Sequence, residues 1–212
     1  MIRLDIFSDP VCPWCYIGKA NLDRAMEAKP DHPFAVEWHP FQLNPGMAAG
    51  GVDRAEYLAA KFGGRVDEIN DRVAQAFAAA GLQVDFANIS RIPNTLDAHR
   101  LIHWAGLEGR QAAVVSALFR AYWREGRDIG DCEVLAQIAG DAGMDAAMTA
   151  RLLASDADAS DIAARDQDAR SKGVNAVPTY LIAQQYVLSG AQQPELWGQV
   201  MTELAAQVAA PA

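Results

Sequence analysis

The sequence predicts an α/β fold in which one sheet is interrupted by a large all-helical insertion. Alternating apolar residues at 3–8 and 34–43 predict two strands, and helical spacing at 14–28 places a helix between them. Helical spacing then dominates as far as residue 172, and a strand pattern returns at 179–182 and 186–189 before a last helix at 193–208. The predicted order is therefore β-α-β, a helical insertion, and α-β-β-α.

The first helix has a well-marked start. Pro13 stands at the first helical position, where its missing N–H has no intrahelical partner to lose. This makes Cys12 the expected N-cap residue. The two late strands are close enough for a hairpin, although their link lacks the usual glycine or asparagine, so the turn type is left open.

The middle of the chain carries several helix start and stop signals. Many predicted helices follow Asp, Asn or Ser and end at Gly, as helices commonly do. The helices are expected at 55–62, 66–80, 95–107, 110–125, 133–142, 146–154 and 161–172. We accordingly predict a sheet domain formed by residues 1–54 and 161–212, and an inserted helical domain formed by residues 55–160.

Composition argues against several classes of protein. The chain has 212 residues and a formal net charge of -9, and no cluster of Lys and Arg could follow a phosphate backbone. We therefore expect no nucleic-acid partner. The apolar runs are too short to span a bilayer and the N-terminus lacks the pattern of a signal peptide, so we expect a cytoplasmic protein without a membrane partner.

The chemistry is expected at Cys12 and Cys15, two of the three cysteines. A helix N-terminus favours a thiolate, which is the attacking species in disulfide exchange. Cys12 is then the nucleophile, and Cys15, one turn later, is the resolving thiol. Two alternatives are weaker. Zinc would need further ligands, which His99 and His103 could supply, and a purely structural disulfide is uncommon in the cytosol. We therefore expect no metal at this pair.

Five segments together resemble the DsbA-like thioredoxin superfamily, and within it the FrnE-like cytosolic branch. They occur in the order SDPVCPWCYIG (8–18), FQLNP (41–45), NTLDAHR (94–100), GVNAVPTY (173–180) and SGAQ (189–192). The resemblance implies a thioredoxin-like fold with a helical domain inserted after the second strand. It also implies a cis Val177–Pro178 peptide beside the dithiol, so that Pro178 belongs to the catalytic centre and Val177 pairs with an extended substrate.

The same superfamily includes kappa-class glutathione transferases and 2-hydroxychromene-2-carboxylate isomerases, which resemble a version with Ser in place of the first cysteine. A glutathione-dependent isomerase or transferase is therefore the alternative function. The retained Cys12 and Cys15 favour a thiol–disulfide oxidoreductase, which acts on protein or small-molecule disulfides and needs no cofactor. Glutathione is left open as a co-substrate, and Asn44 falls where these relatives would be expected to hold it.

A few further residues are candidates. Pro13 and Trp14 lie between the cysteines and are expected to contact substrate. His99 is expected to lie in the cleft wall formed by the insertion and to face the dithiol, although a satisfied helical histidine is the more common case. Cys132 is expected to be a small packed residue rather than a second reactive thiol. The oligomeric state is not fixed by the sequence, which is compatible with a homodimer.

Overall fold

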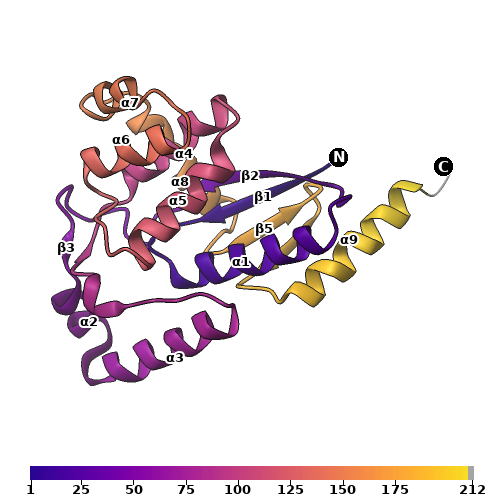
Figure 1. Ribbon diagram of the computed structural model, residues 1–212, viewed down its shortest axis with the longest axis horizontal. Helices are drawn as coiled ribbons and strands as arrows, with labels where there is room; N and C mark the ends of the chain where they lie inside the picture. The colour runs from indigo at the N-terminus through magenta and orange to yellow at the C-terminus, as the bar shows by residue number, and fades with distance from the viewer. Residues whose placement is uncertain (210–212) are drawn as a thin grey trace.

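A four-stranded mixed sheet forms the centre of the computed structural model, which describes residues 1–209. The sheet order is β2-β1-β5-β6 (Figure 1). Strand β1 is parallel to β2 and antiparallel to β5, which in turn pairs with β6 in an antiparallel hairpin. The strands are β1 (Ile2–Ser8), β2 (Phe34–Pro40), β5 (Thr179–Ile182) and β6 (Tyr186–Ser189). This confirms the predicted α/β, thioredoxin-like class.

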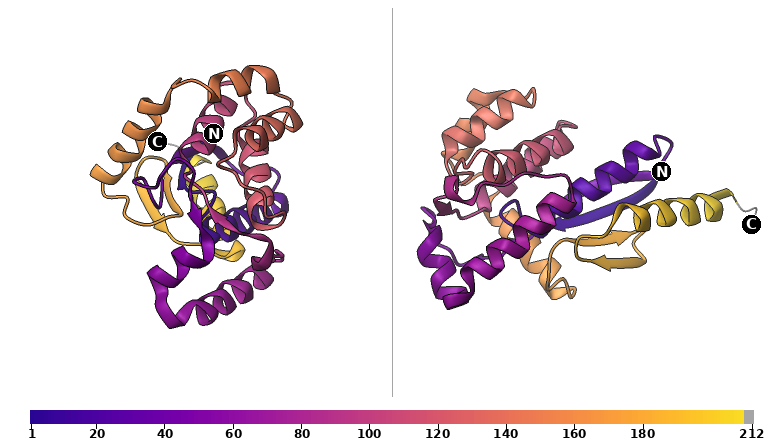
Figure 2. Two further views of the ribbon diagram at one scale, coloured as in Figure 1. Left: turned by 90° about the vertical axis from the view of Figure 1, so that its left-hand side faces the viewer. Right: turned by 60° about the horizontal axis from the view of Figure 1, so that its bottom comes forward.

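Helices α1 (Pro13–Ala28) and α9 (Pro194–Ala209) pack against each other and cover one face of this sheet (Figures 1 and 2). Trp197 of α9 is fully buried there and packs edge-on against Tyr180 of β5 and Phe34 of β2. Truncating a buried Trp to Ala typically costs about 3–5 kcal/mol of stability, so Trp197 contributes on this order to the fold. The face therefore has a firm aromatic core.

Gly18 lets α1 approach the sheet closely. A Cβ atom at this position would overlap the Tyr180 hydroxyl and come within 3.1 Å of the Pro178 ring. Tyr180 is 1% exposed and packed against Trp197, so it has little room to move aside. The glycine three residues after Cys15 thus permits the contact that brings the Pro178 loop against the helix of the dithiol.

The inserted segment forms two groups of helices. In Figure 2, α2 and α3 project from one side of the molecule, and α4 to α7 gather on another. A two-stranded ladder of β3 and β4 lies beside α2. The elements are β3 (Val52–Asp53), α2 (Arg54–Phe62), α3 (Val66–Ala79), β4 (Arg91–Ile92), α4 (Leu96–Leu107), α5 (Gln111–Trp123), α6 (Cys132–Asp141), α7 (Ala146–Leu153) and α8 (Ala159–Ser171), with short 3-10 turns at Gly63–Arg65 and Phe86–Asn88.

The structure refines several expectations. The second strand ends at Pro40 rather than at residue 43, and the helices end within a few residues of their predicted bounds. The hairpin turn places Ala183 and Gln184 at φ 52° and 57°, the left-handed conformation that a tight turn requires. Cys132 is exposed, so the expectation of a packed thiol is wrong.

The division into domains at residues 54/55 and 160/161 stays a prediction, and its last three residues lie outside the described part of the chain. Helix α8 begins at Ala159 and contacts both α4 of the insertion and β2 of the sheet. Within residues 1–209, no helix combines the length and the apolar character needed to cross a membrane.

Candidate active site

The two cysteines lie at the first turn of α1, as predicted. Cys12 is the N-cap residue and Pro13 follows at the first helical position. The Cys12 N–H donates to the Asp9 carbonyl at 2.9 Å, and the Cys15 N–H donates to the Cys12 carbonyl at 3.2 Å. Both thiols are buried and neither is in a disulfide. The helix start therefore holds the two thiols at one turn.

The two thiols have different surroundings. Burial and the neighbouring Cys12 side chain raise the pKa of Cys15 well above its ordinary value, whereas contacts with Ser8 and the Asp9 backbone act in the opposite direction. At neutral pH Cys15 is consequently a protonated thiol. A buried, protonated Cys15 is compatible with its predicted role as the resolving thiol.

The Val177–Pro178 peptide is cis, as the resemblance implied, and lies beside the dithiol. The Cys12 thiol donates to the Val177 carbonyl, with a sulfur–oxygen distance of 3.6 Å. The Pro178 carbonyl accepts from the Gly190 N–H at 2.8 Å, which ties this loop to the end of β6. Cys12, Cys15, Val177 and Pro178 thus form one cluster, although their chemical roles stay predictions.

Asp9 is a buried carboxylate beneath the dithiol loop, and the sequence analysis did not single it out as a site residue. Its carboxylate accepts from the Leu43 N–H at 2.7 Å and from the Val11 N–H at 3.4 Å. Burial raises the pKa of Asp9 to about 7, although these two hydrogen bonds lower it. The acid residue thus joins the dithiol loop to the segment after β2.

His99 lies against Asp9 in this structure. The distance from His99 Nε2 to Asp9 Oδ1 is 3.9 Å, which is too long for a hydrogen bond, and this Nε2 has no hydrogen-bond partner. Burial lowers the pKa of His99 to about 4, against the influence of Asp166 and of the Phe41 backbone. Between about pH 4 and pH 7 both groups are therefore neutral, and their contact is not an ion pair. The suggested effect of His99 on the thiolate stays a prediction.

Trp14 is half-buried and lines cavities on both of its sides. One, of about 240 Å³, includes Pro13, Asn44 and Trp123 in its walls. The other, of about 350 Å³, includes Val177, Gly190 and Ala191. The predicted substrate contacts Pro13, Trp14, Val177 and Asn44 are thereby brought to the surroundings of the dithiol. The helices of the insertion that line these two cavities are α2, α3 and the end of α5, rather than the start of α4.

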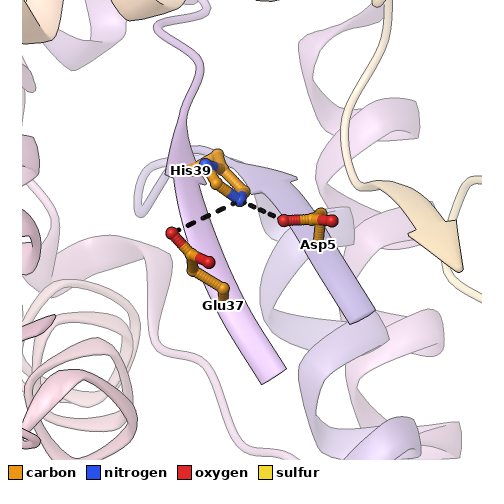
Figure 3. A group of neighbouring side chains, drawn as sticks. All are labelled: Asp5, Glu37 and His39. Atoms are coloured by element: carbon orange, nitrogen blue, oxygen red, sulfur yellow. Dashed lines mark hydrogen bonds and ion pairs between the residues drawn. The ribbon is translucent and has the colours of Figure 1, made fainter. Parts of the chain in front are cut away.

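A larger cavity, of about 730 Å³, lies along β2, α4 and α5, away from the dithiol. Figure 3 shows a polar cluster at its edge, where His39 Nε2 lies 2.6 Å from Asp5 Oδ1 and 3.9 Å from Glu37 Oε1. Arg3 already pairs with Asp5 at 2.7 Å and with Glu37 at 3.1 Å. Arg3, Asp5, Glu37 and His39 therefore already have partners within this cluster. Asp5, Glu37 and His39 are also the residues, within the described part of the chain, whose side chains lie close enough together to hold a metal ion. This group contains neither Cys12 nor Cys15.

Sequence reasoning also missed Arg54, Tyr57 and Lys61, which line the smaller cavity beside Trp14. Tyr57 and Lys61 belong to the helix predicted at 55–62, and Arg54 is the residue before it. Helical spacing does not say which neighbour a helix packs against. Asp9 did have a sequence signal, since it is an acidic residue inside the SDPVCPWC segment.

The fold and the dithiol define a thioredoxin-fold protein with a CXXC pair at the start of its first helix. The model of the DSBA-like thioredoxin domain matches residues 3–201, and the chain belongs to this family. The crystal structure of a probable DsbA oxidoreductase from Streptomyces coelicolor is 32% identical. The match covers 100% of this chain and 93% of that one, with a TM-score of 0.87.

More distant matches share the fold. Cytosolic disulfide reductase DsbM from Pseudomonas aeruginosa, solved with GSH, is 22% identical with a TM-score of 0.66, and the match covers 97% of this chain and 98% of that one. A 2-hydroxychromene-2-carboxylate isomerase is 17% identical with a TM-score of 0.73, and 98% of each chain is covered. The uncharacterized Bacillus subtilis protein YwbO is 27% identical over 155 residues, which are 69% of this chain and 68% of YwbO. The neighbours thus include both oxidoreductases and an isomerase.

Proposed function

We propose that this protein is a thiol–disulfide oxidoreductase that cycles its Cys12–Cys15 pair between dithiol and disulfide. The observation that supports this most strongly is the pair itself, at a proline-initiated helix start beside the Val177–Pro178 loop. In the reducing direction the Cys12 thiolate attacks a substrate disulfide and expels one thiolate. Cys15 then loses its proton and attacks Cys12 Sγ, which releases the second substrate thiol and leaves a Cys12–Cys15 disulfide. Pro178 and Val177 shape the site for this exchange.

The proposal includes a cytoplasmic setting, with glutathione as the thiol that reduces Cys12–Cys15 again. Two glutathione molecules give up two electrons and two protons, and one glutathione disulfide is formed. A glutathione-dependent isomerase is the competing function, because such a reaction could use Cys12 without cycling Cys15. The second thiol at α1 supports the oxidoreductase, since isomerisation gives it no task.

The test is a turnover assay with the purified wild-type protein. We expect it to accelerate the reduction of hydroxyethyl disulfide by glutathione, and the reduction of insulin disulfides by dithiothreitol shows whether protein substrates also fit. Acceleration should be at least about tenfold over the uncatalysed exchange. The proposal fails if both reactions run at the background rate while the protein isomerises a glutathione-dependent substrate.

A further inference from the structure

Arg54 lies in the smaller cavity beside the dithiol as a half-buried cation. Its guanidinium donates to Asn70 Oδ1 at 3.0 Å and lies over the Phe86 ring, 5.0 Å from the ring centre. Among residues 1–209, no Asp or Glu oxygen forms an ion pair with it, whereas Arg3 pairs with two carboxylates and Arg91 and Arg100 with one each. A desolvated guanidinium keeps its charge and is costly to leave without an anion.

A second cation lies at the same cavity. Lys61 Nζ donates to the Tyr57 hydroxyl at 3.0 Å, and this hydroxyl donates to Asn44 Oδ1 at 2.7 Å. The amide oxygen of Asn44 is thereby used, so its NH₂ group is the donor that a ligand would meet. Two cations and an amide donor thus lie around one small cavity of a chain whose net charge is -9. The polar side of the cavity thus suits an anion.

The remaining walls of the cavity are apolar and aromatic. They include Trp14, Val73, Phe86, Tyr122 and Trp123. Val11 and Pro13, the two neighbours of Cys12 in the sequence, also line it, which places the cavity beside the turn that carries Cys12. The volume of about 240 Å³ is suited to a single ring with a small substituent rather than to a folded protein.

From this arrangement we infer that the cavity binds the carboxylate-bearing aromatic half of a small disulfide, with Arg54 holding the carboxylate and the ring between Trp14 and Phe86. This inference rests on the proposed function, because it names the substrate class of the same dithiol. The chemistry is the exchange described above: the Cys12 thiolate displaces one aryl thiolate, and Cys15 displaces the other. Arg54 binds substrate and takes no part in the transfer of electrons.

The test compares two aryl disulfides with the same reduced protein by stopped flow. Dithiobis-nitrobenzoate carries a carboxylate on each ring, whereas dithiodipyridine is neutral. Arg54→Gln should slow the reaction of the first probe about tenfold, the usual effect of losing a charge-assisted hydrogen bond, and leave that of the second within about twofold. Arg54→Lys should recover part of the loss. Arg165→Gln removes a charge from α8, where Arg165 pairs with Asp161, and should change neither rate.

Both probes are measured with the same protein sample, so a partial loss of folding lowers both rates equally and leaves their ratio unchanged. Equal slowing of both probes by Arg54→Gln would show that Arg54 is structural, and unchanged rates would show that no anion binds there; either result overturns the inference alone. If the wild-type dithiol reacts with neither probe, the proposed function itself fails.

Discussion

A Cys15→Ser variant is expected to attack a disulfide substrate once and then stop. Cys12 is still the N-cap of α1 and still lies beside Val177, so the first exchange should proceed. Without the Cys15 thiol, the mixed disulfide has no internal group to release it. Turnover of a protein disulfide should therefore fall by at least about a hundredfold, while a covalent protein–substrate adduct accumulates. Non-reducing electrophoresis and mass mapping of the adduct to Cys12 would measure this.

The matched control for this experiment is Cys132→Ser. Cys132 is exposed at the start of α6, and the partial loss of water around its thiol, followed by the charges of Asp97 and Asp131, raises its pKa. Its removal should leave turnover unchanged. An adduct that maps to Cys132, or a Cys15→Ser variant with full turnover, would contradict the assignment of the two roles.

Replacing Asp9 with asparagine is expected to change how stability depends on pH. An unfolded aspartate has a pKa of about 3.9, and burial raises that of Asp9 to about 7 in the fold. The fold therefore favours the neutral acid, and the stabilisation from its proton is complete below the unfolded pKa and lost as the pH rises through 7. Asparagine resembles the neutral acid and cannot ionise.

Wild type therefore loses stability at Asp9 as the pH rises, whereas the Asp9→Asn variant does not. Each pKa unit corresponds to about 1.4 kcal/mol, so the free energy of unfolding of Asp9→Asn, relative to wild type, should increase by about 2–4 kcal/mol between about pH 4 and pH 8. Urea denaturation at a series of pH values measures this difference. Glu68→Gln, an exposed carboxyl on α3, is the control. Parallel stability curves for Asp9→Asn and wild type would contradict the account of a buried neutral acid.

His99 changes the pH dependence of stability in the direction opposite to Asp9. Its pKa is lowered from 6.5 to about 4, so its contribution to stability is present above 6.5 and lost as the pH falls through 4. In wild type the two effects offset each other over much of this interval. The Asp9→Asn variant should therefore lose more stability than wild type on acidification, because the contribution of His99 then stands alone.

The elements that the sequence predicted best are those governed by local rules. The proline at the first helical position, the alternating strands and the spacing of Cys12 and Cys15 each depend on a few adjacent residues. The cis peptide before Pro178 depended on the family resemblance, since most X–Pro bonds are trans. The two-residue strands β3 and β4 are too short to show any period, and they were missed for that reason.

The site's surroundings depend on contacts between segments far apart in the chain. Asp9 is buried in contact with the Leu43 backbone N–H and the His99 ring, and the sequence around Asp9 carries no sign of those partners. Similarly, Arg54 was not singled out, and the helix predicted beside it was expected to begin at residue 55. Its importance comes from the absence of an acidic partner among the described residues and from the aromatic walls around it.

The most direct test of the central claim is the thiol balance of a single oxidation. Reduced protein is mixed with one equivalent of a disulfide, quenched with acid, alkylated and mapped by mass spectrometry. We predict that Cys12 and Cys15 are lost together as one intramolecular disulfide, and that Cys132 is recovered as a free thiol. Recovery of all three thiols, or oxidation at Cys132 with the Cys12–Cys15 pair intact, would contradict a catalytic dithiol at the start of α1.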